Sequence, residues 1–253
     1  MEKAGLNNIL KTTVYSSLFV QIITGITGIG FHFLPVPGEL LIVKKMLGLE
    51  ILVQLIEGAF YVWFASIFSY VKNVTPNRYY DWAITTPTMV FTFCLYLDYL
   101  GEREKNKENR EPLIEKPGAE NSVPERPSVK NTTIVEYFKQ NWGVLLPIFF
   151  LNWMMLIFGY LGEIGELDTK LAVLCGFLPF LTYFVIIYDK FAKYSSFNGK
   201  ILYWIFFAIW SLYGLAALGS YYWKNIAYNI LDLLAKNFFG IVLAYTVYIG
   251  VYK

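Results

Sequence analysis

"NILDLLAKNF", residues 229–238, is the stretch that decides the fold, because it places Asp232 and Lys236 four positions apart within a long apolar segment. A charged side chain at the depth of a bilayer costs about 3 kcal/mol even on lenient insertion scales. Residues of this kind normally face the interior of a helix bundle and pair with one another. The stretch therefore indicates a buried charged site inside a bundle of membrane helices.

The composition of the whole chain agrees with a membrane location. Charged residues make up only 16% of the 253 residues, whereas an ordinary soluble domain is about 25% charged. A bilayer core about 30 Å thick needs roughly 20 apolar residues per helix. Stretches of this length occur at residues 12–34, 49–71, 78–100, 142–162, 169–190, 200–223 and 226–251. None alternates as a barrel strand does, so we predict one all-α domain over residues 1–253, a seven-helix multi-pass integral membrane protein.

The distribution of lysine and arginine predicts the orientation of this bundle. With the N-terminus outside, 14 basic residues lie on the cytoplasmic side and six on the opposite side. The positive-inside rule therefore places the N-terminus outside and the C-terminus in the cytoplasm. Residues 101–133, between the third and fourth helices, are rich in Glu, Lys, Asn and Pro, which is typical of disorder. We expect a disordered cytoplasmic linker there, and its mixed charges do not favour nucleic-acid binding.

Polar residues recur at helical spacing on one face of three predicted helices. The last helix has Asn225, Asn229, Asp232 and Lys236. The third has Arg78, Asp81, Thr85, Thr88 and Thr92, and the second has Glu50, Gln54, Glu57 and Tyr61. An acidic stripe across a membrane is a feature of cation pathways. The second helix therefore suggests an ion pathway.

Lys236 has a chemical interpretation besides ion pairing. A purely structural cluster with Asp81 and Asp232 is one alternative, but such clusters seldom stabilise a fold on balance. A buried lysine amine is also the group that forms a Schiff base with an aldehyde. In that case Asp81 and Asp232 would be counter-ions to the protonated imine, and together with Arg78 the four charges would balance.

Four segments, in order along the chain, resemble the motifs of microbial rhodopsins. "RYYDWAITTPTM", residues 78–89, resembles the third-helix motif R-Y-x-D-W-x-x-T-T-P. "FGYLGEIG", residues 158–165, is similar to the fourth helix of proteorhodopsin-like members. "WSLYGLAALG", residues 210–219, resembles the sixth-helix pocket, and "LDLLAKNFFG", residues 231–240, resembles the lysine motif D-x-x-x-K. The chain is identified as a member of this family.

The resemblance implies a role for each matching position. Lys236 would carry all-trans retinal as a protonated Schiff base, with Asp81 as primary counter-ion and proton acceptor. Asp232 would be the second counter-ion, and Arg78 would tune both carboxylates. The pocket walls would comprise Trp82, Thr86, Pro87, Met89, Trp210 and Tyr213. Flat aromatic rings suit a long conjugated chain.

Departures from the family pattern carry their own expectations. Gly214 stands where the family has proline and Ala217 where it has a pocket tryptophan, so we expect looser packing at the ring end. Met89 lies at the colour-tuning position of proteorhodopsins, and an apolar residue there predicts green absorption. Thr92 stands where outward proton pumps have a carboxylic donor, which predicts slow turnover for a pump.

The pair Lys236-Asn237 resembles channelrhodopsins, in which this asparagine, a second-helix glutamate and a first-helix serine close the central gate. The resemblance assigns Asn237 and Glu57 to that gate. Ser17 is the candidate for the third member, with Gln21 or Thr24 as alternatives. Glu50, Gln54 and Arg78 would complete the ion pathway. We expect Glu57→Gln to alter current while leaving the colour nearly intact.

Thr86 replaces the algal third-helix cysteine, and Asn152 is the candidate partner on the fourth helix.

The pattern most resembles the viral channelrhodopsins, the group 1 viral rhodopsins of giant algal viruses, which would place the protein in a host cell membrane. The resemblance implies a photoreceptor that acts as a light-gated cation channel. We expect it to contact membrane lipid, to form a homo-oligomer and to conduct monovalent cations. Whether it also conducts divalent cations or protons stays open. A light-driven outward proton pump is the alternative, and a sensory rhodopsin is less supported because no transducer-binding face is evident. The sequence contains no metal-ligand cluster and no hydrolase or nucleotide-binding motif, so we expect no enzyme.

Overall fold

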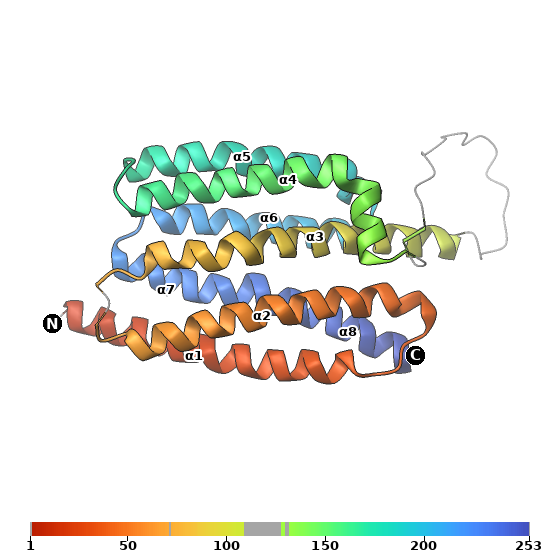
Figure 1. The fold of residues 1–253 in the computed structure, drawn as a ribbon, viewed down its shortest axis with the longest axis horizontal. Coiled ribbons are helices and arrows are strands. Elements are labelled where there is room, and N and C mark those ends of the chain that lie inside the picture. Colours follow the sequence, from red (N-terminus) through yellow and green to blue (C-terminus); the bar gives the residue numbers. More distant parts are fainter. Residues whose placement is uncertain (1, 71, 109–127, 130–131, 253) are drawn as a thin grey trace.

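The computed structural model describes residues 2–70, 72–108, 128–129 and 132–252, which fold into an all-helical bundle (Figure 1). Its long helices are α1 (Glu2–His32), α2 (Leu41–Ile67), α3 (Thr75–Glu108), α4 (Ile134–Glu163), α5 (Thr169–Lys190) and α6 (Phe197–Ala217). The last helix comprises α7 (Tyr221–Asp232), the π-helical turn η3 (Leu233–Asn237) and α8 (Phe238–Tyr252). Short 3-10 turns lie at Gly38–Leu40 (η1) and Ala192–Tyr194 (η2). Because α7, η3 and α8 follow without a break, the described chain forms the predicted seven-helix bundle.

The arrangement of side chains is that of a membrane protein. Five described segments are long and apolar enough to span a bilayer: Lys3–His32, Ile134–Glu163, Thr169–Tyr194, Phe197–Ala217 and Tyr221–Tyr252. The other two long helices, α2 and α3, contribute buried charged side chains to the interior, which are Glu50, Glu57, Arg78 and Asp81. Large apolar side chains point outward instead, and Phe19, Ile26 and Val185 are each more than 60% exposed. The two termini lie at opposite ends of the bundle (Figure 1).

The helix ends are set by local signals. Thr133 and Glu136 form a capping box at the start of α4, in which each side chain accepts a hydrogen bond from the other residue's backbone N–H. The Asp168 carboxylate accepts backbone hydrogen bonds from Lys170 and Leu171 at the start of α5. Gly165 joins α4 to α5 with a φ of 84°, a conformation that glycine adopts without strain. This tight connection lets α4 and α5 lie side by side (Figure 1).

Two predicted boundaries differ from the structure. Helix α1 begins at Glu2 rather than residue 12, and α3 continues to Glu108, so residues 101–108 are helical rather than part of the expected linker. The extension is rich in Glu, Lys and Arg, which are good helix formers. The Ser128 hydroxyl and the Val129 N–H both donate to the Glu102 carboxylate at 2.6 Å, which brings the chain back to α3. Residues 109–127 and 130–131 of the predicted linker lie outside the described residues.

Helices α1 and α2 are antiparallel and approach closely through glycines, which are common at helix interfaces in membranes. A side-chain carbon added at Gly28 would lie 3.3 Å from Ile51, and one added at Gly48 would lie 3.1 Å from the ring of His32. This close packing brings the polar faces of α1 and α2 together.

Candidate functional site

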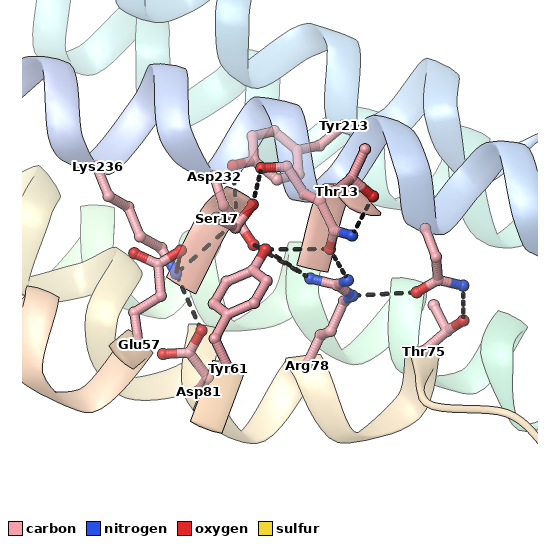
Figure 2. A network of polar contacts seen from close by, with 12 residues as sticks. Thr13, Ser17, Glu57, Tyr61, Thr75, Arg78, Asp81, Tyr213, Asp232 and Lys236 are labelled. Carbon is pink, nitrogen blue, oxygen red and sulfur yellow. Dashed lines mark hydrogen bonds and ion pairs between the residues drawn. The ribbon is translucent and has the colours of Figure 1, made fainter. Parts of the chain in front are cut away.

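Lys236 lies in the polar interior of the bundle, at one end of the network drawn in Figure 2. It belongs to the π-helical turn η3, a distortion that is frequent at functional sites. The Lys236 side chain is 2% exposed, and its amine donates to Asp81 Oδ2 at 2.9 Å. Glu57 Oε1 lies 3.3 Å from Nζ, and Asp232 Oδ1 lies 3.9 Å away. The structure therefore brings together the predicted lysine and both predicted counter-ions, and it adds a third carboxylate from α2.

The position of Glu57 changes two expectations. The sequence suggested two carboxylates balanced by two cations, Lys236 and Arg78. Three buried carboxylates leave one negative charge in excess if all five groups are ionised. Because Glu57 is nearer to Lys236 Nζ than Asp232 is, its charge acts directly on the nitrogen that would carry a chromophore. We therefore expect Glu57→Gln to change the colour of the pigment, contrary to the sequence-based expectation.

Arg78 organises one half of the site, on the side of Lys236 toward Thr75 (Figure 2). Its guanidinium is fully buried and pairs with Asp232 Oδ2 at 3.2 Å. It donates to the Tyr61 hydroxyl at 3.3 Å, to Asn225 Oδ1 at 3.1 Å and to Asn229 Oδ1. A planar fork with five donors suits such a set of acceptors. The network therefore holds an arginine at a depth where its charge needs compensation.

The remaining polar groups of this half complete the network. Asp232 also accepts from the Tyr61 hydroxyl at 2.8 Å and from the Tyr213 hydroxyl at 2.9 Å. The Asn229 amide donates to Thr13 at 2.8 Å, and the Ser17 hydroxyl donates to the Asn229 carbonyl at 3.1 Å. The Asn225 amide similarly donates to the Thr75 hydroxyl at 2.9 Å. The helices α1, α2, α3 and α7 are thus tied together by side-chain hydrogen bonds.

A cavity between the helices has Lys236 in its wall. Its walls come mainly from α3, α4, α5, α6 and α7. They include five of the predicted wall residues, Trp82, Thr86, Met89, Trp210 and Tyr213. A long aromatic cavity that ends at a buried amine beside carboxylates fits retinal, whose aldehyde would reach Lys236 and whose apolar chain would contact the rings.

Sequence reasoning missed several walls of this cavity. Tyr79, Tyr228, Met155, Phe177 and Phe180 also line it. A side-chain carbon added at Gly214 would lie 2.5 Å from the Phe177 ring. Packing at this position is therefore close rather than loose, because an aromatic ring from α5 lies directly against the glycine. Met155, Phe177 and Phe180 belong to no motif that we recognised, whereas Tyr79 lies within the third-helix motif at residues 78–89.

The predicted pair on the third and fourth helices is present. The Asn152 amide donates to the Thr86 hydroxyl at 2.7 Å, and Asn152 is completely buried. This bond joins α3 to α4 beside the cavity, in the position suggested for it.

On the side of Lys236 toward Glu50 and Thr92, the structure agrees only in part with the expected gate of Glu57, Asn237 and Ser17. Asn237 Oδ1 accepts a hydrogen bond from the Thr24 hydroxyl, one of the two alternatives to Ser17. The Ser17 hydroxyl instead donates to the backbone carbonyl of Asn229, and within the described residues it makes no hydrogen bond to Glu57 or Asn237. Further inward, the Thr92 hydroxyl donates to Glu50 Oε1. The third helix lacks a carboxylic donor there, but α2 supplies a carboxyl to the same place.

The bundle and its cavity define a class of protein: a seven-helix membrane protein with a buried lysine at the end of an aromatic pocket. A family model described as bacteriorhodopsin-like protein matches residues 12–249, and the chain belongs to this family, the microbial rhodopsins. The family consists of retinal-binding transporters and photoreceptors rather than enzymes. The chain is therefore a multi-pass integral membrane protein for light-driven ion transport or photoreception.

Solved structures have the same fold. Viral rhodopsin OLPVRII is 24% identical with a TM-score of 0.73, and the match covers 96% of this chain and 99% of that one. A blue light-absorbing proteorhodopsin from Med12 is 17% identical with a TM-score of 0.67, over 96% and 99% of the two chains. Xanthorhodopsin, described as a light-driven ion pump with dual chromophore, is 16% identical with a TM-score of 0.65, over 96% and 93%. No curated protein has a matching sequence.

Proposed function

We propose that this rhodopsin is a light-gated cation channel that carries all-trans retinal on Lys236. The observation that supports it best is the row of buried polar side chains between α1, α2, α3 and the last helix. From the N-terminal end inward the row comprises Thr75, Asn225, Arg78, Asn229, Ser17, Tyr61, Asp232, Asp81, Lys236, Glu57, Gln21, Gln54, Asn237, Glu50 and Thr92. Polar and acidic linings of this kind are what cations require in a membrane.

Retinal, when bound, supplies light absorption and an isomerisation that displaces the nitrogen of Lys236. Lys236 Nζ lies 2.9 Å from Asp81 Oδ2 and donates a hydrogen bond to it, so Asp81 is the group placed to accept its proton. After that transfer the nitrogen is neutral and no longer attracts Glu57 and Asp232. Coulomb attraction at such distances is strong in a buried site, so its loss favours rearrangement of both carboxylates.

The gate would lie where Glu57 and Asn237 flank Lys236 on two different helices. Asn237 uses its carbonyl oxygen to accept from Thr24, whereas its Nδ2 has no hydrogen-bonding partner in the described part of the chain. Glu57 makes no hydrogen bond there either, apart from its ion pair with Lys236. A weakly bonded pair of this kind can move at low cost once the charge at Lys236 changes.

The test is a light-evoked current under voltage clamp in retinal-supplied cells, with external sodium replaced by a large impermeant cation. A channel gives a current whose reversal voltage moves with the sodium gradient. Glu57→Gln and Asn237→Ala should each alter the current or its selectivity, whereas Glu166→Gln, at an exposed glutamate in the α4–α5 connection, should not. An outward current at every voltage, indifferent to sodium, would refute the channel.

A light-driven outward proton pump is the second candidate, and the Glu50–Thr92 hydrogen bond favours it. A pump needs a carboxyl group on the far side of Lys236 from Asp81 to return a proton to Nζ. Glu50 is completely buried and lies on that side. In a pump, Glu50→Gln would slow the recovery of the pigment after a flash, and external weak acid would restore the rate. In a channel, the same change would leave the reversal voltage dependent on sodium.

A further inference from the structure

Three buried side chains between α1 and α2 have polar atoms that make no hydrogen bond within the described residues, although Glu57 Oε1 forms an ion pair with Lys236. Both polar atoms of Gln21, the Oε1 atom of Gln54 and both carboxylate oxygens of Glu57 have no hydrogen bond within the described residues. Their residues are 3%, 5% and 0% exposed. Leaving a buried polar group unsatisfied costs about 1–3 kcal/mol, and native structures contain few such groups. Several in one place indicate that buried water or a bound ion completes their hydrogen bonds.

The antiparallel packing of α1 and α2 places these groups together. Gln21 faces the Glu57 carboxylate across the interface, outside hydrogen-bond geometry. One turn along α1, a side-chain carbon added at Gly25 would lie 3.7 Å from Gln54 Oε1. One added at Gly240 of α8 would lie 2.4 Å from Gln54 Nε2. The Gln54 amide therefore lies in a slot between two glycines, with its oxygen toward α1.

The donor set specifies the chemistry of the ligand. Two amide oxygens and one carboxylate are hard oxygen ligands, which suit alkali and alkaline-earth cations. A single carboxylate compensates one positive charge, and Lys236 Nζ lies only 3.3 Å from Glu57 Oε1, which opposes a second one. We propose that Gln21, Gln54 and Glu57 form a binding site for a partly dehydrated sodium ion.

The site depends on the charge of Lys236, because both cations compete for Glu57. While Nζ is protonated, it occupies the carboxylate and repels sodium. Once the proton has moved to Asp81, the carboxylate is available to the ion. In this way the site would couple light to ion entry and set the preference among cations. This physiological role rests on the proposed channel function, but sodium binding itself requires neither light nor retinal.

The test uses the purified full-length protein without retinal in lipid nanodiscs. Sodium chloride is titrated at constant ionic strength against N-methyl-D-glucamine chloride, and the melting temperature and the ²³Na NMR linewidth are recorded. We expect a saturable, sodium-specific rise in melting temperature. Lys236→Ala should lower the half-saturating sodium concentration by about tenfold or more, because it removes a positive charge within 4 Å of the carboxylate. Glu57→Gln and Gln21→Leu should abolish the effect.

Gln140→Leu, at an exposed glutamine of α4, is the matched control and should bind sodium as the unaltered protein does. If Gln21→Leu fails to fold, Gln54→Asn, which withdraws the amide by one methylene, should raise the half-saturating concentration. Identical melting in the two salts for the Lys236→Ala protein would mean that water alone satisfies these atoms, and would overturn the proposal. So would sodium binding that survives both Glu57→Gln and Gln21→Leu.

The binding and current measurements separate the two proposals. Sodium binding without a passive current would leave the site in place and refute the channel. A current that reverses with the sodium gradient, without saturable binding, would leave the channel in place and refute the site.

Discussion

On the side of Lys236 toward Thr75, the network around Arg78 has no unbonded polar atom within the described residues, whereas several polar atoms on the other side have no hydrogen bond. Arg78 donates to four side chains, and the amides of Asn225 and Asn229 both have acceptors. Beyond Lys236, Gln21 has no partner in the described chain, and Asn237 uses only its oxygen. A complete network holds one arrangement, while an incomplete one is costly unless something else binds. The comparison suggests that the first half holds the helices in place. In the second half, ions would bind and side chains would rearrange.

The largest effect is expected at Lys236, which separates the two halves. Lys236→Ala should abolish the visible absorption band that forms when all-trans retinal is added, because no other amine lines the cavity in the described structure. Lys224→Ala is the control, since Lys224 lies at the start of α7 and pairs with Glu163 at 2.7 Å. The measurement is an absorption spectrum of the purified protein. A coloured Lys236→Ala protein would overturn the assignment of the cavity.

A large effect on stability is expected from Arg78. Arg78→Gln leaves buried Asp232 without its cation, and breaking a buried pair costs about 3–5 kcal/mol. Reversible unfolding in mixed detergent micelles measures the free energy of unfolding. Arg103→Gln, at an exposed arginine on the same helix, should have little effect. An equal stability of Arg78→Gln and the unaltered protein would show that the first half is not the scaffold.

A small effect on stability is expected from Gln21. In sodium-free buffer, Gln21→Leu should change the free energy of unfolding by less than about 1 kcal/mol, because replacing an unsatisfied polar group by an apolar one of similar shape is nearly neutral. The same unfolding titration tests it. A loss as large as that of Arg78→Gln would mean that the second half is as fully bonded as the first, and the contrast would fail.

The smallest effect concerns colour alone. Met89 is 1% exposed and lines the cavity without belonging to either polar half. We expect the unaltered pigment to absorb in the green and Met89→Gln to shift the maximum toward the blue. Absorption spectra record both, and the unfolding free energy serves as the control. A blue maximum for the unaltered protein would contradict this role of Met89.

Residues that share a helix were the most predictable part of the site. Asp232 and Lys236 lie one turn apart on the last helix, and Arg78 and Asp81 lie one turn apart on α3, so spacing alone puts each pair on one face. The same periodicity predicted Glu57 on the inward face of α2, but not its distance from Lys236. Likewise, the sequence shows Thr92 at the position where outward proton pumps have a carboxylic donor. It does not show that Glu50 of α2 bonds to Thr92.

By itself, the sequence determined the seven apolar helices, the buried lysine with its two aspartates, and the membrane location, because burial of charge in lipid and helical periodicity act within single segments. Only the tertiary structure decided that Glu57 joins the lysine, that Thr24 rather than Ser17 contacts Asn237, and that Gln21 and Gln54 face an unsatisfied site. These outcomes depend on the rotation and register of one helix against another. Glycines such as Gly28 and Gly48 allow the close packing between α1 and α2, and no pattern along one helix specifies such packing between helices.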